Sequence, residues 1–169
     1  MKSNFKTLIG AAALIAAFGA GAVQRDITVT ADIDSTVDVT QADGSALPSS
    51  VAMQYLPGKG LNAYRQNIKF WSNVADRNLN ISLATSPSLT DANGANAIPL
   101  SVTVNGTALT TTASTLTFAS LFPAGIANGS SAVPLMISQT NPGSTVASGR
   151  YSGIVSLVVT QATATGTGS

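Results

Sequence analysis

The sequence predicts an all-β protein folded as an antiparallel sandwich. Apolar and polar residues alternate along most of the chain, which is the pattern of strands with one buried face. Turn signals separate these stretches, and no segment after residue 22 keeps the helical repeat of about 3.6 residues. With 169 residues, 44% of them hydrophobic and 9% charged, the chain suits one domain with an apolar core.

The composition excludes several chemistries. The chain has no cysteine and no histidine, and its seven acidic residues are all aspartate. A Ser-His-Asp triad, a Cys-His pair and a thiolate or imidazole metal site are therefore excluded, and so are disulfides. A formal charge of +1 gives no basic footprint for nucleic acid. We expect a protein that is not an enzyme and needs no cofactor.

Residues 1–22 have the pattern of a secretory signal peptide. Lys2 and Lys6 precede an apolar stretch that is too short to span a bilayer, and small residues follow it. Cleavage is expected between Ala22 and Val23. The alternative is a retained N-terminal anchor.

The first stretch of the mature chain is a long alternating run, residues 27–39. Its apolar face carries Ile27, Val29, Ala31, Ile33, Val37 and Val39. Thirteen residues at about 3.3 Å each span about 43 Å, more than twice a typical strand. Because Ser35 interrupts the apolar face, we interpret the run as two strand segments that can belong to different sheets or different molecules. The alternative is that the whole run forms this molecule's own first strand and bend.

Further strands follow at regular spacing. Alternating apolar residues mark strands within 51–55, 64–71, 79–83, 98–104, 135–137 and 151–160, with shorter strands around Leu109 and Leu116. Asn105-Gly106 predicts a type I′ hairpin turn, and residues 119–126 allow one helical turn. Seven or so short strands indicate an immunoglobulin-like sandwich.

Two other features have ordinary explanations. Asp32, Asp34 and Asp38 alternate with apolar residues and lack the following ligand-Gly pair and distal Glu of a calcium loop, so we predict no metal site. Trp71 is expected to point outward, opposite the face of Tyr64. It could stack on a sugar or form a subunit contact.

Five stretches carry a further signal: VQRDITVTADID, VTQADGSALPSSV, Ala63-Tyr64-Arg65, Ser88-Leu89-Thr90-Asp91 and GRYSGIVSLVV. They resemble the major pilins of the alternate chaperone–usher pathway, the class 5 fimbriae, which include colonisation-factor and cable pilus major subunits. They are spread over nearly all of the mature chain. Two departures are a Ser at position 35, where several family members carry Pro, and a longer C-terminal tail.

The resemblance implies an incomplete immunoglobulin-like sandwich that lacks its last strand. A periplasmic chaperone would fill the open groove first. At the outer-membrane usher, the N-terminal segment of the next subunit would replace the chaperone. The implied donor residues are Ile27, Val29, Ala31 and Ile33, and the implied acceptor edge is Tyr151, Val155, Leu157 and Val159. The implied boundaries are a donor strand at 23–34, a pilin domain at 35–160 and a flexible tail at 161–169.

The expected function is that of a major structural subunit, exported through the periplasm and polymerised head to tail into a surface fimbria that supports adhesion. Identical subunits, the chaperone, the usher and a tip adhesin subunit would be its partners. The alternative is a minor or tip adhesin that binds host glycans. Tip adhesins of the family are about twice as long, because a receptor domain precedes the pilin domain, and we expect no such domain here.

Overall fold

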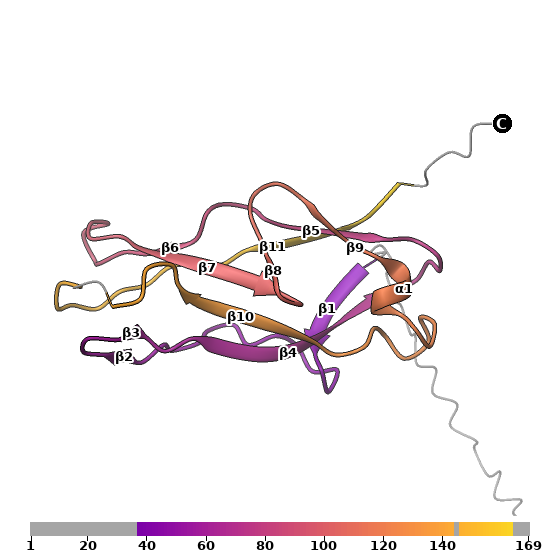
Figure 1. Ribbon diagram of the computed structural model, residues 1–169, viewed down its shortest axis with the longest axis horizontal. Coiled ribbons are helices and arrows are strands. Elements are labelled where there is room, and N and C mark those ends of the chain that lie inside the picture. Colours follow the sequence, from indigo (N-terminus) through magenta and orange to yellow (C-terminus); the bar gives the residue numbers. More distant parts are fainter. Residues whose placement is uncertain (1–36, 144–145, 164–169) are drawn as a thin grey trace, which may run out of the picture. The chain divides into compact units, whose positions relative to one another are not determined.

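Two antiparallel sheets face each other across an aliphatic core in the computed structural model (Figure 1). The structure describes residues 37–143 and 146–163. The predicted signal peptide with its cleavage site at Ala22 and Val23, and the predicted donor residues Ile27, Val29, Ala31 and Ile33, lie outside these ranges.

The larger sheet has six strands and the smaller sheet has three. In spatial order, the larger sheet contains β1 (Val37–Gln41), β4 (Tyr64–Ser72), β10 (Val133–Gln139), β7 (Ile98–Val104) and β6 (Ser88–Leu89), with β8 (Thr107–Ala108) paired to β7. The smaller sheet contains β11 (Leu157–Gln161), β5 (Leu79–Leu83) and β9 (Ser114–Leu116). A separate hairpin joins β2 (Tyr55–Leu56) to β3 (Gly60–Leu61), and α1 (Phe118–Leu121) is a single helical turn.

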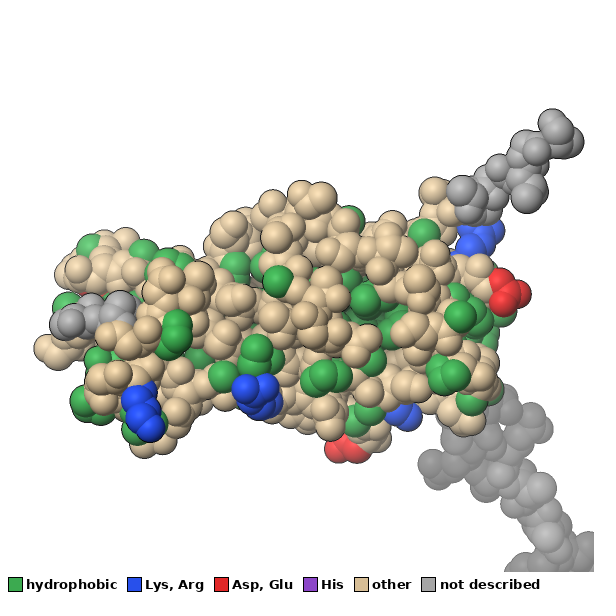
Figure 2. All heavy atoms as spheres, viewed as in Figure 1, with side chains coloured by type: hydrophobic (Ala, Val, Ile, Leu, Met, Phe, Trp, Pro, Cys, Tyr) green, Lys and Arg blue, Asp and Glu red, His purple; other side chains and the backbone are tan. Residues whose placement is uncertain are grey.

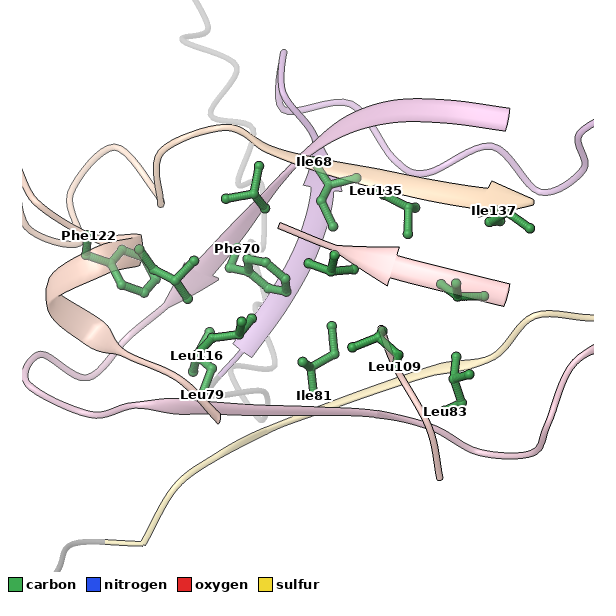
Figure 3. Packing of buried hydrophobic residues seen from close by; sticks show 14 of the residues in the cluster. Ile68, Phe70, Leu79, Ile81, Leu83, Leu109, Leu116, Phe122, Leu135 and Ile137 are labelled. Atoms are coloured by element: carbon green, nitrogen blue, oxygen red, sulfur yellow. The ribbon is translucent and has the colours of Figure 1, made fainter. Parts of the chain in front are cut away.

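The alternation in the sequence decides which side chains fill the core. On β4, Ile68 and Phe70 are completely buried, whereas Lys69 between them is not. Leu79 and Ile81 of β5 are equally buried and lie across the core from them (Figure 3). Leu135 and Ile137 extend the larger sheet's contribution, so the inner faces are mostly aliphatic, with Phe70 and the half-buried Tyr64 of β4 as aromatic exceptions.

Several local predictions are confirmed. Asn105 and Gly106 have φ angles of 52° and 76° and connect β7 to β8, as a type I′ turn requires. The single helical turn is α1, which ends just before Pro123.

Three predicted boundaries are wrong. The strand expected over 151–160 is regular only from Leu157, because Ser152 pairs with Thr90 next to β6 rather than with β5. The tail was expected to start at residue 161, but Gln161 belongs to β11 and the Ala162 N–H donates to the Asn78 carbonyl. Within 51–55, only Tyr55 lies in a strand.

Trp71 is part of the scaffold. Its indole N–H donates to the Thr40 hydroxyl at 2.8 Å. A Cβ at Gly129 would come within 3.1 Å of the indole ring, so the ring covers the backbone at that position. The half-buried indole therefore holds β1 and the loop after α1 against β4.

We predict that Ile81→Ala lowers the free energy of unfolding by about 2–5 kcal/mol, because it leaves a cavity at a fully buried position. Urea unfolding, followed by the fluorescence of the single tryptophan, measures the loss.

The control is Ser82→Ala, the next residue on β5, which is only half-buried and should change stability by less than about 0.5 kcal/mol. Equal losses in the two variants would contradict this description of the core.

Candidate functional site: a groove beside the last strand

The strand order is that of an immunoglobulin-like domain with one strand fewer. Strands β1, β4, β10 and β7 follow the order A-B-E-D of one sheet, and β5 with β11 corresponds to the C-F pair of the other. A complete domain places strand G on the second edge of strand F. Within residues 37–143 and 146–163, no strand pairs with that edge of β11.

The hydrogen bonds of the last segment show which groups remain at this edge. Ser152 exchanges two hydrogen bonds of 2.9 Å with Thr90, and the Ser156 carbonyl accepts from the Ala84 N–H at 3.0 Å. Successive residues of a strand direct their N–H and C=O groups to opposite edges. The odd-numbered residues from Tyr151 to Leu157 therefore direct theirs to the edge that has no partner.

An apolar groove of about 1010 Å³ opens beside this edge. We call it the last-strand groove. Its floor is the inner face of β7 and β10, with Ile98, Leu100, Leu135 and Ile137. Residues 47–53, between β1 and β2, border it on one side, and residues 146–155 together with Leu157 border it on another. The remaining lining residues are Tyr55, Leu61, Tyr64 and Leu89.

The four predicted acceptor residues do not all lie in the groove. Tyr151, Val155 and Leu157 line it. Val159 is not among its lining residues; it is half-buried against the core, opposite Ile81. The groove thus lies beside the segment that leads into β11 more than beside β11 itself.

Sequence reasoning missed most of the groove. The sequence predicts a strand within 51–55, because Val51, Met53 and Tyr55 alternate with polar or small residues, and this alternation is the only local signal for that side of the groove. In the structure all three line the groove, and Val51 is 42% exposed. The alternation placed the floor residues on buried strand faces. The local sequence pattern is the same for a residue enclosed in the core and for one that faces a groove, so it could not identify the floor.

Gly153 allows the last segment to approach β6 closely. A Cβ at this position would overlap the Ser88 carbonyl oxygen and come within 3.1 Å of the Leu89 Cδ2 atom. Only glycine fits without a backbone shift. Gly153 therefore allows the hydrogen bonds between Ser152 and Thr90 to form, and these bonds hold one border of the groove in place.

Charge is scarce around the groove. Of its lining residues, only Arg150 is charged, and its side chain is exposed. On the face shown in Figure 2, charged side chains are few among hydrophobic and uncharged polar groups. No group of three or more potential metal-ligating acids occurs among the described residues.

Two carboxyl groups have lowered pKa values, both in exposed loops outside the groove lining. The pKa of Asp91 is lowered by the Ala95 backbone N–H and then by the Asn96 side chain. The pKa of Asp43 is lowered by the Ser45 hydroxyl and then by its backbone N–H. These are turn-stabilising contacts, and they place no acid–base pair in the groove.

No helix in the described part of the chain could cross a membrane.

The fold and the groove together define a structural subunit: an immunoglobulin-like domain whose last edge can receive a strand. Comparisons with known proteins agree. Residues 23–160 match the family described as CS1 type fimbrial major subunit. The chain therefore belongs to this family and is the major structural subunit of a surface fimbria.

Individual relatives cover nearly the whole chain. It is 42% identical to a CFA/I fimbrial subunit of Escherichia coli O78:H11 over 93% of this chain and 98% of the relative. It is 38% identical to a CS1 fimbrial subunit of Escherichia coli over 95% of this chain and 99% of the relative. The solved CooA pilin subunit from enterotoxigenic Escherichia coli has a TM-score of 0.67 and 32% identity, covering 76% of this chain and 89% of that one. These relatives do not favour the tip-adhesin alternative.

We predict that Gly153→Ala destabilises the protein by about 1–3 kcal/mol, because the added methyl group forces residues around Ser152 away from β6. Urea unfolding measures the loss, and hydrogen exchange at the Ser152 amide shows whether the bridge has opened.

Gly149→Ala is the matched control. Its Cβ would meet only the Tyr151 Cε2 atom at 3.6 Å, an ordinary contact, so stability should be preserved. A Gly153→Ala variant as stable as this control would show that the segment is not held at close approach.

Proposed function

We propose that the subunits polymerise by strand donation, with residues 23–34 of one subunit filling the last-strand groove of the next. One observation carries the proposal: an unpartnered strand edge lies next to an open apolar groove. An edge of this kind is a template for pairing with another chain. Addition of a strand from a second molecule satisfies the backbone and buries apolar surface in one step.

The N-terminal segment has the properties of the missing strand. Ile27, Val29, Ala31 and Ile33 alternate with polar residues, so an extended segment presents all four to one face. Burial of Ile27, Val29 and Ile33 at about 1.5–3 kcal/mol each contributes on the order of 5–9 kcal/mol before association costs. Backbone hydrogen bonds along Tyr151–Leu157 add to this. A donor that leaves its own body produces a head-to-tail contact that does not close, and hence a filament.

The remaining partners are those that the resemblance to class 5 fimbriae implies. A periplasmic chaperone would lend a strand to the open edge before assembly, an outer-membrane usher would exchange that strand, and a tip adhesin would stand at the fibre end. During export, the signal peptide would be cleaved between Ala22 and Val23. The family match, which begins at residue 23, supports this position. The role needs neither a catalytic group nor a cofactor.

We predict that Val29→Asp abolishes fibre formation, because a charge would be placed in the apolar groove. Deletion of residues 23–34 should have the same effect while leaving a body that the chaperone still binds. Electron microscopy of cells expressing the whole fimbrial operon, together with immunoblotting for the pilin, provides the readout.

Thr30→Asp adds the same charge to the opposite face of the donor segment and should leave fibres intact. Normal fibres from Val29→Asp, or from the deletion, would rule out the donor role.

A second prediction separates donation between molecules from an N-terminal segment that folds back into its own groove. Appending a second copy of residues 23–34 to the C-terminus through a flexible linker should give a soluble monomer that resists urea and no longer polymerises. The unmodified mature chain, purified alone, should aggregate or polymerise on size-exclusion chromatography. A stable monomer without the added segment would favour the fold-back alternative.

A further inference from the structure

Arg150 is conspicuous because it is a charged residue in the lining of an apolar groove and has no charged partner among the described residues. It is the one charged residue in the groove lining, and it directly precedes Tyr151 on the last segment. Its side chain is exposed, and it makes no hydrogen bond or ion pair in the described part of the chain. A strand entering the groove therefore meets a single positive charge at this end.

The proposed donor segment carries the opposite charge. Residues 23–34 contain three aspartates and one arginine. Asp32 and Asp34 lie at its C-terminal end and alternate with Ala31 and Ile33, so they lie on the face opposite the apolar residues. The aspartates would remain at the surface while the apolar residues enter the groove.

The direction of pairing brings the two charges together. In an immunoglobulin-like sheet, the last strand pairs antiparallel with strand F, which is β11 here. The C-terminal end of the donor would then lie near the start of the last segment, where Arg150 is found. Directly paired residues have side chains on the same face, so the odd-numbered apolar donors face the odd-numbered acceptors.

Two registers keep all four apolar donors opposite residues 151–159. In the first, Ile33 faces Tyr151 and Asp34 faces Arg150. In the second, Ile33 faces Gly153 and Asp34 faces Ser152. Arg150 is then only a diagonal neighbour of Asp34, two residues from the one directly opposite. The registers differ by two residues, about 7 Å along the strand.

The groove favours the first register. It places the four apolar donors opposite Leu157, Val155, Gly153 and Tyr151, all of which line the groove. The second register places Ile27 opposite Val159, which does not line it. The position of the groove and the opposite charges of Asp34 and Arg150 are independent observations, and both favour the first register.

We propose that Asp34 of one subunit pairs with Arg150 of the next and fixes the register of the donated strand. The inference rests on the strand donation proposed above. The planar guanidinium can donate to both carboxylate oxygens at once, which gives the pair directional specificity. Exposed ion pairs add little affinity, so its main effect is to reject a slipped strand. Asp34 directly precedes the stretch leading into β1, which places the pair at the junction between neighbouring subunits.

Disulfide trapping tests the register without disturbing the pair, because the full chain contains no cysteine. In the proposed register Asp32 faces Ser152, whereas in the slipped register it faces Ile154. Opposite residues have Cβ atoms about 4.5–5.5 Å apart and diagonal ones about 7–8 Å, and a disulfide needs about 3.5–4.5 Å.

Fibres of Asp32→Cys/Ser152→Cys should therefore form covalent multimers on non-reducing gels, whereas Asp32→Cys/Ile154→Cys should remain mostly monomeric. The reverse pattern, or fibres in which neither pair cross-links, would overturn the proposed register.

Charge reversal tests the pair itself. Arg150→Glu and Asp34→Lys should each raise the rate of fibre dissociation in denaturant by about 2- to 5-fold. The double variant should return the rate to near that of the unmodified fibre. The differences should shrink at about 1 M salt, where charges are screened beyond about 3 Å. Arg65→Glu, an exposed charge on the outward side of β4, is the matched control.

If Arg150→Glu fibres dissociate at the same rate as Arg65→Glu fibres, the proposed ion pair is wrong. It is also wrong if fibres of the double variant dissociate as fast as those of either single variant. Should a single variant form no fibres, the double variant still decides: restored fibres support the pair and continued loss overturns it. Fibres that require Val29 but are indifferent to Arg150 would overturn only the pair, whereas fibres that tolerate Val29→Asp would overturn strand donation too.

Discussion

The unpaired edge of the last strand is the constraint on which the rest of the structure depends. Backbone N–H and C=O groups need partners wherever water is excluded, and a strand seated on the apolar floor formed by Leu100, Leu135 and Ile137 would exclude it. Proteins usually blunt such edges with charges, prolines or covering loops. Among the described residues that line the groove, Arg150 is the only charged one, and no described strand covers the edge there. Under the proposed strand donation, the core, the sheet order and the groove would all contribute to one interface between subunits.

The course of the last segment explains why the opening exists. Residues 157–161 pair with β5 in the smaller sheet, whereas Ser152 pairs with Thr90 beside β6 in the larger one. The segment thus crosses from one sheet to the other, and the smaller sheet, with its three strands, does not cover the inner face of β7 and β10 there. Gly153 permits this crossing because it has no side chain to collide with Ser88.

Local patterns in the sequence were enough to predict the core, but not the groove. Alternation alone assigned Phe70, Ile81 and Val102 to buried faces, because a side-chain period of two is a property of each strand by itself. Alternation also put Tyr151, Val155 and Leu157 on one side, and the structure places them along the groove. It could not indicate that the groove stops before Val159 or that residues 47–53 border it. Both depend on where other strands end, which is a tertiary property.

The alignment of a donated strand along residues 151–157 also determines how a fibre built in this way would carry load. Antiparallel ladder bonds lie perpendicular to the strands, so tension along the donated segment acts across many of them at once. A strand peeled from one end would instead lose its bonds one by one. A pull directed along the donated segment would therefore load such an interface in shear, where many hydrogen bonds must break together, and the joint would need no disulfide to resist it.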